Sequence, residues 1–109
     1  MTTEIERELH QLVEAVKRSK NCREYYRWRK VLESDPELFE RVNDFRKTAY
    51  ELQISEDDGT LEERIEKYMA ENAELTEEPR VRAFLDAELD LCRMLQTITD
   101  KVVRGIDFK

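Results

Sequence analysis

Only a few side chains in this sequence could do chemistry, and the two cysteines come first. Cys22 and Cys92 fall on the apolar stripes of predicted helices, where a free cysteine is normally a small buried side chain. Two chains together would supply four thiols, the number that holds an iron–sulfur cluster, but the spacing does not show that the thiols converge. The one histidine, His10, lies on the polar side of its helix. We therefore expect no metal and no cofactor, and keep a thiol-ligated iron–sulfur regulator as an alternative.

Glu88 is an acidic residue at the centre of an otherwise apolar helical stripe. Asn72 and Arg29 lie near the apolar faces of their own predicted helices, and either side chain could pair with the carboxylate. Because burying an unpaired charge is costly, the main interpretation is a buried polar contact that fixes the register of packing. The lesser interpretation is a catalytic acid.

General acid–base catalysis would need a second titratable group in the same cleft, and no spacing in the sequence guarantees one. The chain also lacks a glycine-rich nucleotide loop and a nucleophile elbow. We predict no catalytic residue and do not expect an enzyme.

Length and composition bound the fold that must position these residues. The chain has 109 residues, enough for one domain that spans residues 1–109, and 41% of them are charged while Gly and Pro number only 2 each. This balance is typical of long charged helices. No apolar run is long enough to cross a membrane, and the residues after Met1 are not basic as in a signal peptide. We expect a cytoplasmic protein without a membrane partner.

Signals for helix starts predict three helices in the first half of the chain. Thr3 and Glu6 make a capping box, and a break is expected near Lys20. Asp35 disfavours the helical conformation because it precedes Pro36, so it should cap the third helix.

Two more helices are predicted in the second half. Thr60 and Glu63 open the fourth, and Thr76 closes the connection to the fifth. The fifth helix is expected from about Glu77 to Arg104, with Gly105 as its C-terminal cap, and is roughly 40 Å long at 1.5 Å per residue. The predicted fold class is all-α, an antiparallel helical bundle of four to five helices with a long C-terminal helix.

The apolar stripe of the fifth helix is longer than the shorter helices can cover. We therefore predict a homo-oligomer, a dimer or larger, joined through this helix with help from the third. The predicted contact residues are Phe84, Leu91, Leu95, Ile98 and Val102.

Charge is unevenly distributed along the chain. Residues 17–30 hold seven bases and one acid, a formal charge of +6, while the rest carries −13 and the whole −7. Arg23, Arg27 and Lys30 share one helical face, with Tyr26 at its edge. Our hypothesis is that this face docks an acidic surface, on a regulated partner or on residues 71–78 of another copy; the alternative is a solvated face. The net charge repels phosphate, so we do not expect direct nucleic-acid binding, and an RNA-binding module is the alternative function.

Several short strings occur in a characteristic order. They are Glu24–Tyr25 with Trp28, Leu32–Leu38, Val42–Arg46 and Glu51–Gln53 in the first half, and Glu78–Val81, Phe84–Leu89 and Leu91–Gln96 in the second. In this order and spacing they resemble the YlbF/YmcA family of small helical bacterial regulators. One departure is the acidic turn Glu56–Gly59, where many relatives carry a longer, Gln-rich link.

The resemblance implies an all-helical bundle, commonly a homo-oligomer, that has no catalytic activity of its own. It implies a regulatory or adaptor protein that acts through protein partners, tied to competence, sporulation and biofilm development and to the endoribonuclease RNase Y. The family complex is also associated with iron–sulfur clusters, but the resemblance assigns no ligand role to either cysteine.

Overall fold

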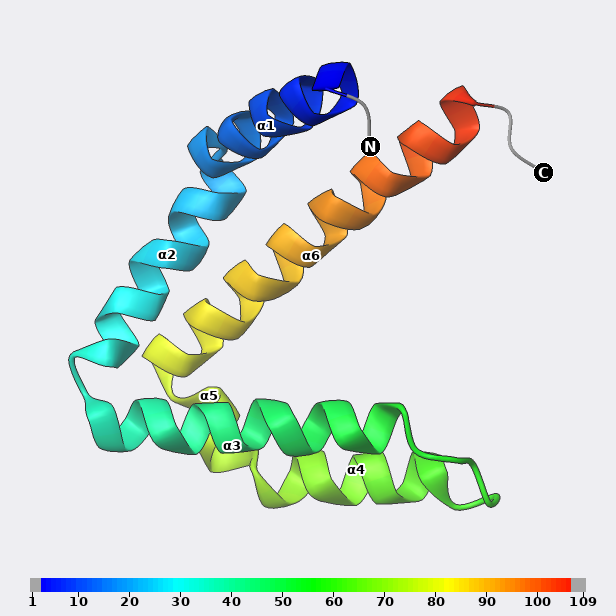
Figure 1. Cartoon of the computed structure of the whole chain (residues 1–109). Helices are drawn as coiled ribbons and strands as arrows, with labels where there is room; N and C mark the ends of the chain where they lie inside the picture. Colours follow the sequence, from blue (N-terminus) through cyan, green and yellow to red (C-terminus); the bar gives the residue numbers. More distant parts are fainter. Residues whose placement is uncertain (1–2, 107–109) are drawn as a thin grey trace. The chain divides into compact units, whose positions relative to one another are not determined.

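The computed structural model describes residues 3–106, and this part of the chain is helical with no strand (Figure 1). The all-α prediction is confirmed, including the long C-terminal helix. Six helices follow one another along the described residues: α1 (Thr3–Arg18), α2 (Lys20–Glu33), α3 (Pro36–Gln53), α4 (Leu61–Glu71), α5 (Ala73–Glu77) and α6 (Pro79–Gly105).

The chain divides into two compact units, and we describe each by itself. The central unit is Lys30–Ala83. The terminal unit combines, among the described residues, 3–29 with 84–106, which are far apart in the sequence.

The central unit contains a helical hairpin in which α3 packs against α4 (Figure 1). The apolar stripe of α3 is buried at Leu38, Val42 and Phe45. The ring of Phe45 stacks on that of Tyr68 from α4, with centroids 5.6 Å apart. Gly59 in the connecting loop has φ +93°, a left-handed conformation that favours glycine. These residues of the α3 stripe are thus used inside the chain, and a contribution of α3 to joining two copies stays a prediction.

The helix starts at the two prolines follow one rule. Asp35 is the N-cap of α3, where its Oδ1 accepts a hydrogen bond of 3.3 Å from the Leu38 backbone N–H, as predicted. Glu78 does the same before Pro79, because its Oε2 accepts from the backbone N–H groups of Arg80 and Val81 at 2.9 and 3.0 Å. Each of these two helices therefore has proline as its first residue and an acidic residue as the cap before it.

The remaining predicted boundaries agree in part. The long fifth helix corresponds to α6, which begins at Pro79, two residues after the predicted start, but Thr76 lies inside the short α5, which was not predicted. Thr60 is the N-cap of α4 as predicted, but its side chain makes no capping bond; its hydroxyl donates to Asp58 Oδ1 at 2.6 Å instead. Gly105 is the last residue of α6 and does not adopt the left-handed conformation of a glycine cap.

In the terminal unit the break between α1 and α2 lies at Ser19, close to the predicted position. The Ser19 hydroxyl accepts a hydrogen bond of 3.2 Å from the Cys22 backbone N–H and donates one of 2.6 Å to the Val16 carbonyl. Cys22, Phe84 and Ala87 are buried in this unit, and the Phe84 ring lies 5.5 Å from that of Tyr25 on α2. No residue of α1 is buried.

Candidate interaction site

The basic face of α2, defined by Arg23, Arg27 and Lys30, is exposed to solvent. These residues follow at i, i+4 and i+7 within one helix, so they share a face. Tyr26 at its edge is also exposed, at 51%. The predicted residues are therefore accessible, and docking through them stays a prediction.

Neighbouring side chains hold part of this face in place. The Arg27 guanidinium lies 5.2 Å from the centroid of the Trp28 ring, a cation–π contact, and 3.6 Å from the carboxylate of Glu24. The Tyr26 ring meets the edge of Tyr25 with centroids 5.5 Å apart. Arginine and tyrosine are enriched at the energetic centres of protein interfaces, so the composition of this face suits a protein partner.

The predicted oligomer contact residues on α6 differ in how far they are exposed to solvent. Phe84 is fully buried within the chain, so its inclusion among residues available to a second copy is wrong. Leu91 and Ile98 are half-buried, and Leu95 and Val102 are exposed at 44% and 54%. The free part of the stripe therefore begins at about Leu91.

The apolar stripe of α1 is a candidate surface that the sequence interpretation missed. Ile5, Leu9, Leu12 and Val13 are 39% to 53% exposed, although they share one helical face. The regular spacing of these residues was the available signal.

None of the three side chains predicted to form a buried polar contact is buried in the single chain. Arg29 is exposed, while Glu88 and Asn72 are half-buried, so the prediction that these three groups are buried is wrong for the single chain. Asn72 instead lies at the junction of α4 and α5, where its Nδ2 donates a hydrogen bond of 2.9 Å to the Tyr68 carbonyl.

The two cysteines differ in their surroundings. Cys22 is buried as predicted, but Cys92 is exposed, so the prediction that both thiols point inward is wrong for Cys92. Within residues 3–106 no group of three or more His, Cys, Asp or Glu side chains is arranged to hold a metal ion. An iron–sulfur cluster takes four thiolate ligands, and one chain offers two thiols in unlike environments, so a single chain does not fit such a cluster.

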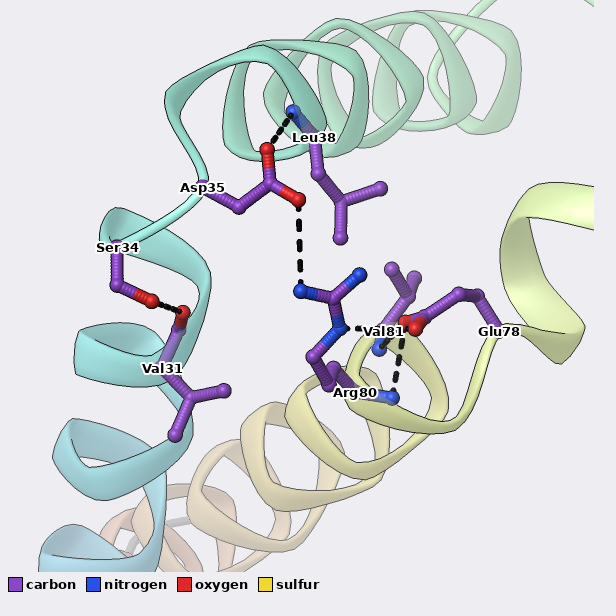
Figure 2. A network of polar contacts seen from close by, with 7 residues as sticks. All are labelled: Val31, Ser34, Asp35, Leu38, Glu78, Arg80 and Val81. Atoms are coloured by element: carbon purple, nitrogen blue, oxygen red, sulfur yellow. Dashed lines mark hydrogen bonds and ion pairs between the residues drawn. The ribbon is translucent and has the colours of Figure 1, made fainter.

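A polar network in the central unit links the two acid–proline helix starts, and the sequence interpretation missed it. Figure 2 shows the Arg80 guanidinium between two carboxylates: its Nε donates to Glu78 Oε1 at 2.8 Å and its Nη1 to Asp35 Oδ2 at 3.4 Å. Beside it, the Ser34 hydroxyl donates to the Val31 carbonyl at 2.5 Å. The repeated acid–proline pair was a signal for the two caps, although not for the arginine between them.

This network shifts the pKa values of Glu78 and Arg80. The hydrogen bond from the Arg80 side chain holds the pKa of the Glu78 carboxyl below its ordinary value of 4.5. The same bond raises the pKa of Arg80, with a smaller contribution from the charge of Asp35. The arrangement is that of charged helix caps held together.

Comparison with known families identifies the chain. The model of the family described as control of competence regulator ComK, YlbF/YmcA, matches residues 5–107. The chain belongs to the YlbF/YmcA family. Neither the curated proteins nor the solved structures contain a match.

The YlbF/YmcA match confirms the resemblance drawn from the short strings in the sequence. It spans residues of both compact units, so the basic face of α2 and the apolar stripe of α6 both lie within the family region. Across residues 3–106, none of the helices combines the length and the apolar character that crossing a membrane requires.

Proposed function

We propose that this YlbF/YmcA protein is a non-catalytic regulator that acts by binding other proteins. Its setting would be the control of competence and related development, through a complex that adjusts RNase Y-dependent mRNA processing. Family membership supports a regulator of competence. The observation that carries the mode of action is the exposed basic face of α2 on a chain with a formal charge of −7.

A local surface of opposite sign to the rest of the chain selects partners by charge. The acidic remainder repels acidic proteins at long range, so an acidic partner is steered toward the basic face alone. Tyr26 and the Arg27–Trp28 pair add aromatic surface that can be desolvated in a contact. The expected partner surface is therefore acidic with some apolar area.

The surroundings of this face favour protein over RNA. A hollow of about 230 Å³ beside it is lined by Lys20, Asn21, Glu24, Ala87 and Asp90. Its carboxylates would repel a phosphate backbone, which typically requires several unopposed cations.

Affinity capture with two matched variants tests the proposal. The first carries Arg23→Glu, Arg27→Glu and Lys30→Glu. The control carries Arg41→Glu, Lys47→Glu and Lys67→Glu, three exposed bases of α3 and α4 that change the net charge equally. We expect the first variant to lose the partners of the native protein, the RNase complex among them, and the control to keep them. Helical circular dichroism should be unchanged in both, because exposed charges contribute little to stability.

Capture of the same partners by the first variant at the same salt concentration would show that the basic face is only solvated surface. A gel shift with RNA at two salt concentrations addresses the alternative function. RNA binding that is lost in the first variant and weakens steeply with salt would replace the protein-binding proposal with an RNA-binding one.

A further inference from the structure

We propose that the central unit carries a second docking site, a pocket between α3 and α5 that binds an arginine side chain from a basic segment of a partner protein. The pocket shares no residue with the basic face of α2 and has the opposite charge. The inference goes beyond the proposed function, because it does not depend on what the basic face binds.

The pocket combines an apolar floor with an acidic rim. Its volume is about 290 Å³, and all of its lining residues belong to the central unit: Leu38, Arg41, Glu74, Leu75, Glu77 and Glu78. Leu38 and Leu75 are 7% and 5% exposed and form the floor. Glu74 and Glu77 are exposed. Figure 2 shows two of the lining residues, Leu38 on α3 and Glu78 just before α6.

Two carboxylates of the rim lack a cationic partner. Residues 68–79 contain four glutamates and neither lysine nor arginine. Glu78 is paired with Arg80, with 2.8 Å between Oε1 and Nε. Within residues 3–106, by contrast, the carboxylates of Glu74 and Glu77 have no ion-pair or hydrogen-bond partner. Arg41 is the one base of the lining against three acids, so the pocket keeps an excess of negative charge.

The placement of these carboxylates is unfavourable for the chain alone. Glu74 and Glu77 lie at i and i+3 in α5, and Glu78 follows at i+4, so like charges share one side of the helix. Glu77 is also the last residue of α5, where the backbone carbonyls favour a basic side chain. Positions that break such local rules without compensation are characteristic of functional sites. A cation bound in the pocket would relieve both costs.

The size and chemistry of the pocket select an arginine side chain. Pockets that enclose whole small molecules measure roughly 300–1,000 Å³, and this one lies below that range, so it suits one long side chain. The methylene stem of arginine would cover Leu38 and Leu75, because such stems lie along apolar surface. The planar guanidinium would donate paired hydrogen bonds to Glu74 and Glu77. Lysine supplies the stem but only a point charge, so arginine fits better.

Binding of a short peptide tests the pocket. The probe is a blocked pentapeptide with arginine at its centre and alanine at the other four positions. Its control replaces arginine with citrulline, which keeps the shape and loses the charge. NMR on the isotope-labelled native protein should show saturable binding of the arginine peptide, with shifts confined to the backbone amides of Leu38, Arg41 and residues 74–78. The citrulline peptide should bind at least about tenfold more weakly, because its hydrogen bonds lose the charge of the donor.

Two pairs of glutamates give a matched test of the residues. Glu74→Gln with Glu77→Gln removes the two carboxylates of the rim. Glu63→Gln with Glu66→Gln removes two exposed carboxylates of α4 at the same spacing. The first variant should lose at least about tenfold in affinity for the arginine peptide, and the second should bind it as the native protein does. The melting temperature of the first variant should not fall, because it removes a like-charge pair.

Each contrary result overturns a stated part of the inference. Equal binding of the citrulline peptide, unshifted amides in residues 74–78, or an equal loss of affinity in both glutamate variants would show that the rim is only solvated surface. Spermidine that shifts the same amides at lower concentration than the peptide would make the pocket a polyamine site. Shifts of these amides that grow with protein concentration alone would assign the pocket to a second copy. None of these readouts involves capture through the basic face of α2, so they fail separately from the proposed function.

Discussion

The central and terminal units bury their apolar residues to very different extents. Of the nine buried core residues among those described, the central unit holds Leu32, Leu38, Val42, Phe45, Leu75 and Val81, whereas the terminal unit holds Cys22, Phe84 and Ala87. The terminal unit also carries most of the large exposed apolar side chains, on α1 and on the C-terminal half of α6. A chain of this size can close one small core by itself, and it has done so around the α3–α4 hairpin.

This difference in burial predicts that mutations in the two units have different effects. The core residues of the central unit are covered by their own chain, so changes to them should act on folding. The apolar residues of α1 and of the C-terminal half of α6 are covered incompletely, so changes to them should act on what the chain binds. Arg23 and Arg27 of the basic face, and Leu95 and Val102 of α6, are exposed side chains of the terminal unit.

The largest expected effect contrasts one leucine from each unit. Leu32 is 0% exposed, and Leu32→Ala should reduce the free energy of unfolding by about 2–5 kcal/mol. Leu12 on α1 is 39% exposed, and Leu12→Ala should cost well under half as much when the protein is dilute enough to be monomeric. Chemical denaturation followed by circular dichroism measures both.

If Leu12→Ala and Leu32→Ala reduced the free energy of unfolding equally in the dilute monomer, α1 would be covered by its own chain and the two units would not differ as described. If the effect of Leu12→Ala grew as the protein is concentrated, α1 would lie in a contact between copies.

Local signals predicted the central unit well. The Asp35–Pro36 pair fixed the start of α3, and the residues at Leu38, Val42 and Phe45 are buried as an amphipathic stripe requires. These features depend on a few neighbouring residues and on one helix facing another that is close in sequence. The family could also be predicted, because it is carried by the order of short strings along the chain.

Exposure in the terminal unit could not be predicted from periodicity. A helical stripe shows which residues share a face, but not whether another element of the same chain reaches that face. Cys92 and Arg29 were misplaced for this reason. The short α5 was missed because Asn72 and Thr76 favour turns as isolated residues, while burial of Leu75 favours a further helical turn there.

A smaller effect is expected from removing one helix cap in each unit. Asp35→Ala removes the cap of α3 and also the contact with Arg80, and should cost about 1–2 kcal/mol. Ser19→Ala removes the cap of α2, and should cost about 0.5–1 kcal/mol. Thermal unfolding at low protein concentration gives both values. If Ser19→Ala were the more damaging, the terminal unit would be the one that limits folding, contrary to the comparison.

The smallest expected effect is a response to acid confined to the central unit. Its α6 cap is the Glu78 carboxylate, whose pKa lies below 4.5 because of the Arg80 hydrogen bond, whereas the α2 cap in the terminal unit is the hydroxyl of Ser19, which does not titrate. A lowered pKa means that the carboxylate form stabilises the folded chain. This stabilisation is complete above pH 4.5 and is lost as the pH falls through the lowered pKa of Glu78.

Glu78→Gln cannot titrate, so its melting temperature should lie below the native one at neutral pH and converge with it in acid. The gap should be small because Glu78 and Arg80 are partly exposed and their attraction is screened. A difference in melting temperature that stays constant from neutral pH into acid would show that the Glu78 charge does not stabilise the start of α6.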